Sequence, residues 1–463
     1  MLQPHPPRRR SRPVQVVAIE TPELGDRSYL VHAGGAGFVV DPQRDIDRML
    51  GAIAGAGVRV SHVFETHIHN DYVTGGLALA AATGAQYVVA GADQVQFPRV
   101  PAGDGSQFQS GPLTVGALHT PGHTPNHLAY VVAEGGRQEA VFTGGSLLYG
   151  TVGRTDLISP ELTEALTRSQ FQSARRLLAS LPSGARVMPT HGFGSFCASS
   201  GTASSQGGDI AQERLQNLAA TIGDEAAFVA TMIGGLGPYP SYYRHMAPLN
   251  RQGPSAFLAR PNAESAGPDL IRQRLSDHAW VIDTRPRRTF AGAHLEGTVS
   301  MELDASFTTY VGWLTPFDAP ITLLADRSED LALAERNLAR IGIDRIEGSS
   351  AGIFPLTGRL PIRSYPVIDF RELQRTLPEG AFVLDVRQPD EWRSGHLAGA
   401  HHLPLQDLPS HLGELPREPI WVHCGAGFRA SVAASLIDRA GLAVVLVDDD
   451  FGQARGAGLP VVS

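Results

Sequence analysis

Short apolar runs rich in β-branched residues alternate with alanine-rich amphipathic runs along the first part of the chain, from Val14 to Met188. Tyr29–Val40 and Val58–Glu65 have the composition of strands, whereas Ile46–Ala56 and Gly75–Thr83 have that of helices. Alternating strands and helices are typical of layered α/β domains. The pattern therefore predicts one such domain in this part of the chain.

The pattern changes after this domain. A stretch rich in glycine and serine, Ala198–Gly208, precedes an apolar run, Ile210–Met232, that predicts a helical segment. Gly234–Pro254 is rich in proline, glycine and tyrosine, which predicts an irregular loop that acts as a lid or a packing segment.

The last two hundred residues contain an internal repeat. Asp385 lies 102 residues after Asp283, and the second copy has a cysteine where the first has Ala325. Two copies of one α/β domain therefore follow the first domain, with expected boundaries at 14–262, 266–362 and 366–463. The matching segments are Trp280–Arg285 with Phe382–Arg387, Gly292–Gly297 with Ser394–Gly399, and Pro320–Ala325 with Pro419–Cys424.

The chain has 463 residues, a length that suits about three domains. Its composition excludes several classes of function. The net charge of −8 argues against nucleic acid or an anionic membrane as the main partner. No run of about 18 apolar residues predicts a membrane span, and the arginine-rich start, Met1–Pro13, lacks the apolar segment of a signal peptide. We therefore expect a cytoplasmic protein.

Two residue types are scarce. The chain has no lysine, which excludes Schiff-base, pyridoxal-phosphate and P-loop lysine chemistry. Its two cysteines, Cys197 and Cys424, are too few for a disulfide-stabilised scaffold, so free thiols in a reducing compartment are expected.

Histidines gather in the first domain. His67, His69 and Asp71 follow a strand-like run directly, while His123 and His191 lie in glycine-containing turns further along. Neutral imidazole nitrogens are good ligands for zinc and iron. The cluster predicts a metal site.

The segment Thr66-His-Ile-His-Asn-Asp-Tyr72, with Pro121-Gly-His123, resembles the metallo-β-lactamase superfamily, which implies an αββα sandwich. Two positions depart from the family pattern. Tyr72 replaces a histidine that binds the second metal in the binuclear hydrolases, and Gly145 replaces a bridging aspartate. The loss of the histidine argues against a two-metal hydroxide and hence against hydrolysis of the glyoxalase II type.

The mononuclear iron branch of this superfamily, the persulfide dioxygenases, is a better match. The resemblance implies one Fe(II) per chain held by His67 and His123, and we expect His69 to turn inward as the third ligand in place of the missing aspartate. Zinc is the alternative metal, and a first domain that has lost its metal is the alternative to a metal site. The Gly153–Asp156 segment also resembles these dioxygenases, which implies a charged pair that orders the loops near the site. A plain structural ion pair between Arg154 and Asp156 is the favoured alternative.

Cys197 lies six residues after His191 in a glycine-rich turn. Two interpretations remain open: a sulfur acceptor or relay close to the metal, or an inert, buried small side chain.

Cys424 begins a glycine-rich loop between a strand and a helix, which aims backbone N–H groups at its centre and predicts a nucleophilic thiolate. With Asp385 and Arg387, this loop resembles the rhodanese (thiosulfate sulfurtransferase) family. Four residues separate Cys424 from Arg429, one fewer than in related phosphatases, which favours sulfur transfer. The loop residues expected to cradle the sulfur are Gly425, Ala426, Gly427 and Phe428, and Arg429 supplies a fixed positive charge.

The first rhodanese-like copy keeps Asp283, Arg285 and His294 but has no cysteine, so we expect it to be inactive and to serve as a spacer, docking or dimer element. The domain order resembles fused persulfide dioxygenase-sulfurtransferases. It implies oxidation of a glutathione or coenzyme A persulfide by dioxygen to sulfite, and transfer of sulfane sulfur between Cys424 and sulfite or thiosulfate. The alternatives are a zinc-dependent thioester hydrolase, and a first domain that only binds.

Overall fold

The computed structural model describes residues 14–198, 207–257, 265–352, 356 and 358–462. The Met1–Pro13 segment and most of Ala198–Gly208 lie outside the described residues. The chain divides into two compact units. The first comprises Met1–Leu236, Tyr243–Leu258 and Arg340–Gly342, and the second comprises Gly237–Tyr242, Ala259–Ala339 and Ile343–Ser463.

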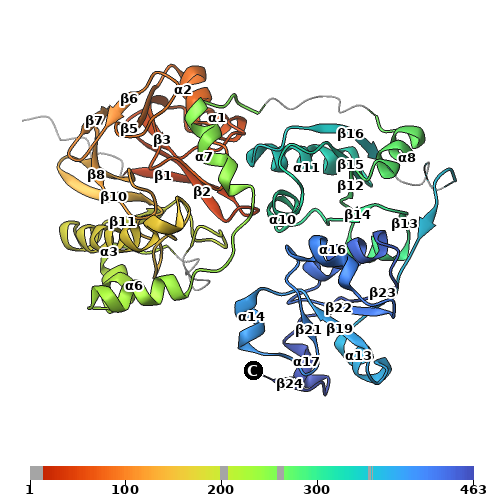
Figure 1. Ribbon diagram of the computed structural model, residues 1–463. Helices are drawn as coiled ribbons and strands as arrows, with labels where there is room; N and C mark the ends of the chain where they lie inside the picture. Colours follow the sequence, from red (N-terminus) through yellow and green to blue (C-terminus); the bar gives the residue numbers. More distant parts are fainter. Residues whose placement is uncertain (1–13, 199–206, 258–264, 353–355, 357, 463) are drawn as a thin grey trace, which may run out of the picture. The chain divides into compact units, whose positions relative to one another are not determined.

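The first unit is built on two sheets that face each other (Figure 1). Aromatic side chains of both sheets meet in the core, where Phe38 contacts Phe64 and Phe142 edge to face. The first sheet has the order β1-β2-β3-β4-β5-β6: Gln15–Thr21, Asp26–Ala33, Ala36–Val40, Arg59–Phe64, Gln86–Ala90 and Val100–Ala102. The second has the order β11-β10-β9-β8-β7: Arg186–Pro189, Arg137–Gly144, Leu128–Glu134, Leu113–His119 and Gln107–Ser110.

Helices cover the outer face of each sheet. Met49 of α1 (Asp47–Ala56) and Leu79 of α2 (Gly76–Thr83) pack on the first sheet, and Phe171 of α3 (Thr163–Ser180) and Phe228 of α6 (Glu225–Gly234) pack on the second. The structure thus confirms the αββα sandwich, and it confirms the helices expected before residue 84 and the strand expected at Val58–Glu65. The strand-like run Tyr29–Val40 is instead an antiparallel pair, β2 and β3, joined by a turn.

The helical segment predicted for Ile210–Met232 is confirmed. It consists of three helices, α4 (Ile210–Gln216), α5 (Leu218–Thr221) and α6, because the side chains of Asn217 and Asp224 cap the second and third. One prediction for this region is wrong. The expected irregular loop contains α7 (Tyr243–Gln252), which buries Tyr243, Met246, Ala247 and Asn250 on one face.

The second unit contains two sheets of the same design. One has the order β14-β12-β15-β16, and the other β18-β23-β22-β19-β21, with parallel pairing in both. The strands of the first are Val299–Ser300, Trp280–Asp283, Ile321–Ala325 and Ile346–Ala351. Those of the second are Val367–Ile368, Val444–Val447, Ile420–His423, Phe382–Asp385 and His401–His402.

Short antiparallel pairs accompany both sheets: β13 (His294–Leu295) with β17 (Ile362–Arg363), and β20 (His396–Leu397) with β24 (Val461–Val462). The principal helices are α8 (Pro268–Ser276), α9 (Arg287–Gly292), α10 (Phe307–Leu314) and α11 (Ser328–Arg340) in the first copy. In the second they are α13 (Phe370–Thr376), α14 (Pro389–Ser394), α16 (Phe428–Arg439) and α17 (Gln453–Gly456). The repeat seen in the sequence therefore corresponds to two similar folds.

Polar contacts join the two copies within this unit. The backbone N–H of Ser300 donates to the hydroxyl of Ser435 at 3.0 Å. Asp438 of α16 lies 3.2 Å from His294 Nε2 and 2.8 Å from Arg363 Nη2. Helix α16, which begins at the Cys424 loop, therefore packs against the first copy. Among the described residues, no helix is both long and apolar enough to cross a membrane.

Candidate active sites

Three buried imidazoles converge at one end of the two sheets of the first unit. His67 follows β4, His123 lies in the turn between β8 and β9, and His191 follows β11. One ring nitrogen from each lies within 4.8 Å of the other two. The Nε2 atoms of His67 and His191 are 3.3 Å apart, which is roughly the separation expected of two imidazole ligands on one tetrahedral ion.

Hydrogen bonds at Nδ1 orient these imidazoles so that their Nε2 atoms converge. His123 Nδ1 donates to the carbonyl of Arg154 at 2.7 Å, so its Nε2 carries a lone pair; this atom is buried and has no hydrogen-bond partner in the described structure. Thr66 donates its hydroxyl proton to Asp41 and so accepts from His67 Nδ1 at 2.9 Å. Such partners commonly orient metal-bound histidines.

His191 Nδ1 points at two carboxylates, Asp26 at 2.9 Å and Asp71 at 3.0 Å. Burial alone would lower the pKa of His191, but Asp71 and Asp26 raise it well above its usual value. Burial, reinforced by Asp71, raises the pKa of Asp26 to about 8. A divalent cation would therefore displace a proton from His191 on binding.

The other two imidazoles are neutral. Burial and the charge of His191 lower the pKa of His123 to about 3, and burial with the neighbouring histidines lowers that of His67 well below its usual value. Neutral, buried lone pairs are the form of histidine that binds zinc or iron. The donor set therefore fits a transition-metal ion.

His69, the third ligand expected from the sequence, does not join this triad. Its Nε2 lies 2.9 Å from the Tyr72 hydroxyl, 3.2 Å from Glu65 and 3.3 Å from Asp41. Although burial would lower its pKa, Asp41 and Glu65 raise the pKa of His69 to about 9. The side chain is a buried imidazolium, and the structure places His191 where the sequence predicted His69.

Gly145 leaves no space for the carboxylate that the family pattern has at this position. A Cβ atom built on Gly145 would overlap the His123 ring, and its backbone N–H donates to His127 Nε2 at 3.1 Å. The His123 ring can occupy its observed position only because residue 145 has no side chain.

We expect Gly145→Asp to destabilise the protein by about 1–3 kcal/mol, because the new side chain forces the His123 ring out of its place. It should also weaken metal binding rather than restore a ligand. Thermal unfolding and zinc titration measure both effects. Gly103→Asp is the control, since a Cβ there meets nothing within 4 Å. Tighter metal binding by Gly145→Asp at unchanged stability would contradict this account.

Arg154 forms the expected ion pair with Asp156. Its guanidinium holds Asp156 with two hydrogen bonds, at 2.7 and 2.8 Å. Its backbone N–H donates to the carbonyl of Cys197 at 2.9 Å, and its own carbonyl fixes His123. The ion pair is confirmed. Arg154 contacts Cys197 and His123 through its backbone N–H and carbonyl, not through its guanidinium.

Cys197 is fully buried beside the triad, with its sulfur 3.9 Å from the Tyr243 hydroxyl. Burial, reinforced by Asp71 and Asp26, raises the pKa of the Cys197 thiol well above its usual value. The surroundings thus oppose a thiolate and favour the inert interpretation of this cysteine.

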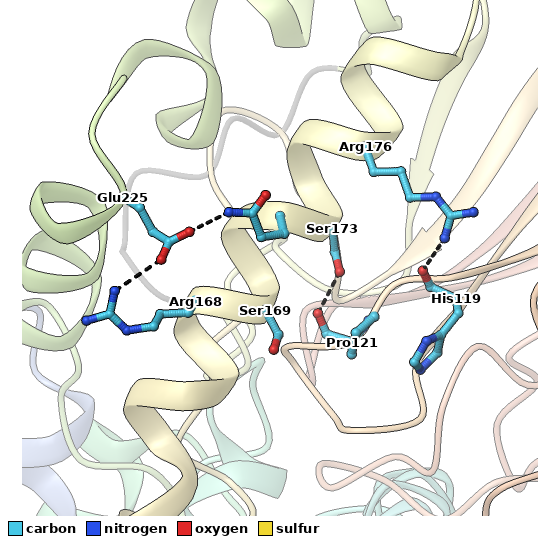
Figure 2. A pocket seen from close by; sticks show the side chains of 8 residues that line it. His119, Pro121, Arg168, Ser169, Ser173, Arg176 and Glu225 are labelled. Atoms are coloured by element: carbon cyan, nitrogen blue, oxygen red, sulfur yellow. Dashed lines mark hydrogen bonds and ion pairs between the residues drawn. The ribbon is translucent and has the colours of Figure 1, made fainter.

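Helix α3 holds the turn that carries His123. Gln170 accepts from the His123 N–H. Ser173 donates to the carbonyl of Pro121 at 2.7 Å, and Arg176 donates to the carbonyl of His119 at 3.0 Å (Figure 2). Ser173, Arg176 and their two partners line a surface pocket of about 460 Å³, whose lining includes none of the three clustered imidazoles. Its arginines already pair with carboxylates, Arg168 with Glu225 and Arg176 with Asp104. We therefore assign this pocket to the structural support of the His123 turn and not to substrate binding.

The second site is the Cys424 loop, residues 424–429. Cys424 follows β22 and is almost completely buried, and its sulfur accepts a hydrogen bond from the Gly427 N–H at 3.1 Å. Gly427 has a φ of +91° and begins α16, so the loop places a backbone donor on the sulfur. One backbone N–H of the kind predicted for this loop therefore donates to the sulfur.

Arg429 makes a bidentate ion pair with Glu391, one arm of which is 2.8 Å long. Burial opposes the charge, but Glu391 raises the pKa of Arg429 further. Glu391 also accepts from the Gln388 N–H at the start of α14. Its role was missed in the sequence, where only its position three residues after Gln388, a capping-box spacing, could have indicated it.

Asp385 and Arg387 form a buried ion pair at 2.6 Å, and Arg387 donates to the carbonyl of Gly395. Asp283 and Arg285 form the same pair in the first copy, which has no cysteine. Because the pair occurs in both copies, we attribute it to the shared fold rather than to the chemistry of Cys424.

Comparisons with known proteins agree with this architecture. Residues 23–191 match the model of the metallo-beta-lactamase superfamily, and residues 369–453 match that of the rhodanese-like domain. A protein named hydroxyacylglutathione hydrolase from Methylococcus capsulatus is 31% identical over 220 residues, covering 46% of this chain and 81% of the relative. One of the same name from Cereibacter sphaeroides is 33% identical over 186 residues, covering 39% and 68%.

A solved structure, a metallo-beta-lactamase from Staphylococcus aureus subsp. aureus COL, matches with a TM-score of 0.65 at 23% identity, and the match covers 73% of this chain and 99% of the other. At that identity the likeness concerns the fold. The chain belongs to the metallo-beta-lactamase superfamily and carries a rhodanese-like domain after the metallo-beta-lactamase domain.

Proposed function

We propose that this protein oxidises a low-molecular-weight thiol persulfide at a single metal ion in its first domain and transfers sulfane sulfur through Cys424 in its last. The observation that supports sulfur transfer is the Gly427 N–H aimed at the buried Cys424 sulfur. The observation that supports mononuclear oxidation is a site with three converging imidazoles, in a chain where Tyr72 replaces the histidine that binds the second metal in the binuclear hydrolases.

In the transfer step, the Cys424 thiolate attacks the outer sulfur of thiosulfate or of a thiol persulfide. The S–S bond breaks, sulfite or thiolate leaves with the electron pair, and Cys424 carries the sulfur as a persulfide. Attack by sulfite on the terminal sulfur then regenerates the thiolate and forms thiosulfate. Backbone N–H groups of the loop hold the negative charge of the persulfide at each stage.

His67, His123 and His191 would hold the metal of the first domain, which we propose is one Fe(II) per chain. Bound iron would supply open positions at which a persulfide anion and dioxygen react. One persulfide, one dioxygen and one water give one thiol and one sulfite, with four electrons passing from the sulfane sulfur to dioxygen. Because all three ligands are neutral once His191 has lost its proton, the charge of the site favours an anionic substrate.

The protein's own residues prepare this site. Arg154 and Thr66 keep His123 and His67 oriented through Nδ1, and Asp26 with Asp71 does so for His191. All three imidazoles are buried, so the surroundings exclude bulk water and strengthen electrostatic interactions with a bound anion.

The second candidate is thioester hydrolysis, which the names of the two relatives favour. Tyr72 weakens this candidate, because two-metal hydrolysis needs a ligand for the second metal at that position. In this chain Tyr72 instead hydrogen-bonds His69, and Gly145 packs against His123. A first domain without catalysis is the remaining alternative.

Metal analysis with three parallel assays distinguishes these functions. We expect about one iron per chain, oxygen uptake with glutathione persulfide or coenzyme A persulfide, and sulfur transfer from thiosulfate to cyanide. A single-site zinc protein that cleaves S-lactoylglutathione without consuming oxygen would overturn the oxidation proposal. Absence of any bound metal with intact sulfur transfer would leave only the function of the last domain.

A further inference from the structure

The first rhodanese-like copy contacts the loop that carries Cys424 in the second. Arg287 and Arg288 begin α9 of the first copy and both donate to Asp448, which follows β23 of the second, at 2.7 and 2.6 Å. Arg287 also lies 3.4 Å from the carbonyl of Ala426 inside the loop. The contact therefore reaches the backbone of the loop itself.

Asp448 lies directly against Gly427. A Cβ atom on Gly427 would overlap the Asp448 carboxylate and approach Arg287 Nε. Gly427 is the residue whose N–H donates to the Cys424 sulfur, and its φ of +91° is one that other residues rarely adopt. The arginines thus act on the donor of the sulfur through a single carboxylate.

The geometry of this contact is itself fixed. Glu302 of the first copy holds Arg287 Nη1 at 2.6 Å, so the guanidinium bridges two carboxylates. Only 5% of the Asp448 side chain is exposed, so removing its partners would leave a nearly buried negative charge beside the loop. Tyr310 of the first copy also packs on Phe428 of the loop, with ring centroids 5.5 Å apart.

We propose that the first copy, although it lacks a cysteine, holds the sulfur-binding loop of the second in its working conformation through Arg287, Arg288 and Asp448. These are positioning residues, because none of them reaches the sulfur. The inference rests on the proposed role of Cys424 and gives the first copy a function in the same reaction.

The test uses the full-length chain with Arg287→Ala and Arg287→Lys, and measures the rate at which iodoacetamide alkylates Cys424 as a function of pH, with the labelled peptide identified by mass spectrometry. In Arg287→Ala, the pH of half-maximal alkylation should rise by about one unit, because the Asp448 charge, left with Arg288 as its only arginine partner of the two, disfavours a thiolate. Transfer from thiosulfate to cyanide should fall roughly tenfold. Arg287→Lys, which keeps the charge but loses the fork geometry, should be intermediate.

Arg363→Ala is the matched control. Arg363 also joins the two copies, through Asp438 at 2.8 Å, but makes no contact described here with the Cys424 loop. It should leave both readouts unchanged. An alkylation profile of Arg287→Ala that superimposes on that of the native protein would overturn the proposal, as would an equal shift in Arg363→Ala. If Arg287→Ala does not fold, the Arg287→Lys profile decides in the same way.

Alkylation needs no substrate, so a native protein without transfer activity would contradict the role of Cys424 while the loop remains testable. Conversely, normal transfer in the native protein with no effect of the arginine variants would contradict only the role of the first copy.

Discussion

Replacing Cys424 with serine should abolish sulfane-sulfur transfer and leave the metal content of the first domain unchanged. A serine hydroxyl cannot carry a persulfide, because no S–S bond can form at that position. We expect the rate of transfer from thiosulfate to cyanide to fall by roughly three orders of magnitude or more, as when other covalent nucleophiles are removed. The fold should persist, since serine is close to cysteine in size and the Gly427 N–H can donate to its oxygen.

Cys197→Ala is the control for this experiment. Cys197 is buried and its thiol has a raised pKa, so its removal should spare sulfur transfer. Cys424→Ser should also retain oxygen uptake with a thiol persulfide. Loss of oxygen uptake to the same extent as transfer would show that the two reactions do not have separate sites.

The Cys424 loop was predictable because its function is local. The cysteine, its glycines and the start of α16 are contiguous in sequence, and the donor to the sulfur, Gly427, is three residues away. The contact that we propose holds this loop was not predictable. Arg287 meets Asp448 across 161 residues, and no periodicity links the two positions.

The same distinction explains the first site. A short motif identified His67 and His123, but the third member of the triad depends on where rings point. His69 is turned away by Glu65, Asp41 and Tyr72, and His191 is turned inward by Asp26, which is 165 residues distant. Helix α7 was missed for the opposite reason, because local proline and glycine masked a buried helical face.

The ligand set leads to the second large effect. His191→Ala should bind metal at least about a hundredfold more weakly, because it removes one of three converging donors. His69→Gln should keep its metal stoichiometry, although it should unfold at lower temperature by the loss of about 3–5 kcal/mol, since Asp41 and Glu65 lose their buried partner. Zinc competition titration at low temperature measures the first effect, and thermal unfolding measures the second.

These two variants discriminate between the triad in the structure and the one expected from the motif. If His69 were a ligand, His69→Gln would lose metal and His191→Ala would retain it. His123→Ala serves as the positive control, because His123 belongs to both sets and its unpartnered Nε2 has no other role among the described residues. Equal metal affinity in His191→Ala and the native protein would exclude the triad. It would also exclude the argument that His191, from the end of β11, replaces the missing family aspartate as a ligand.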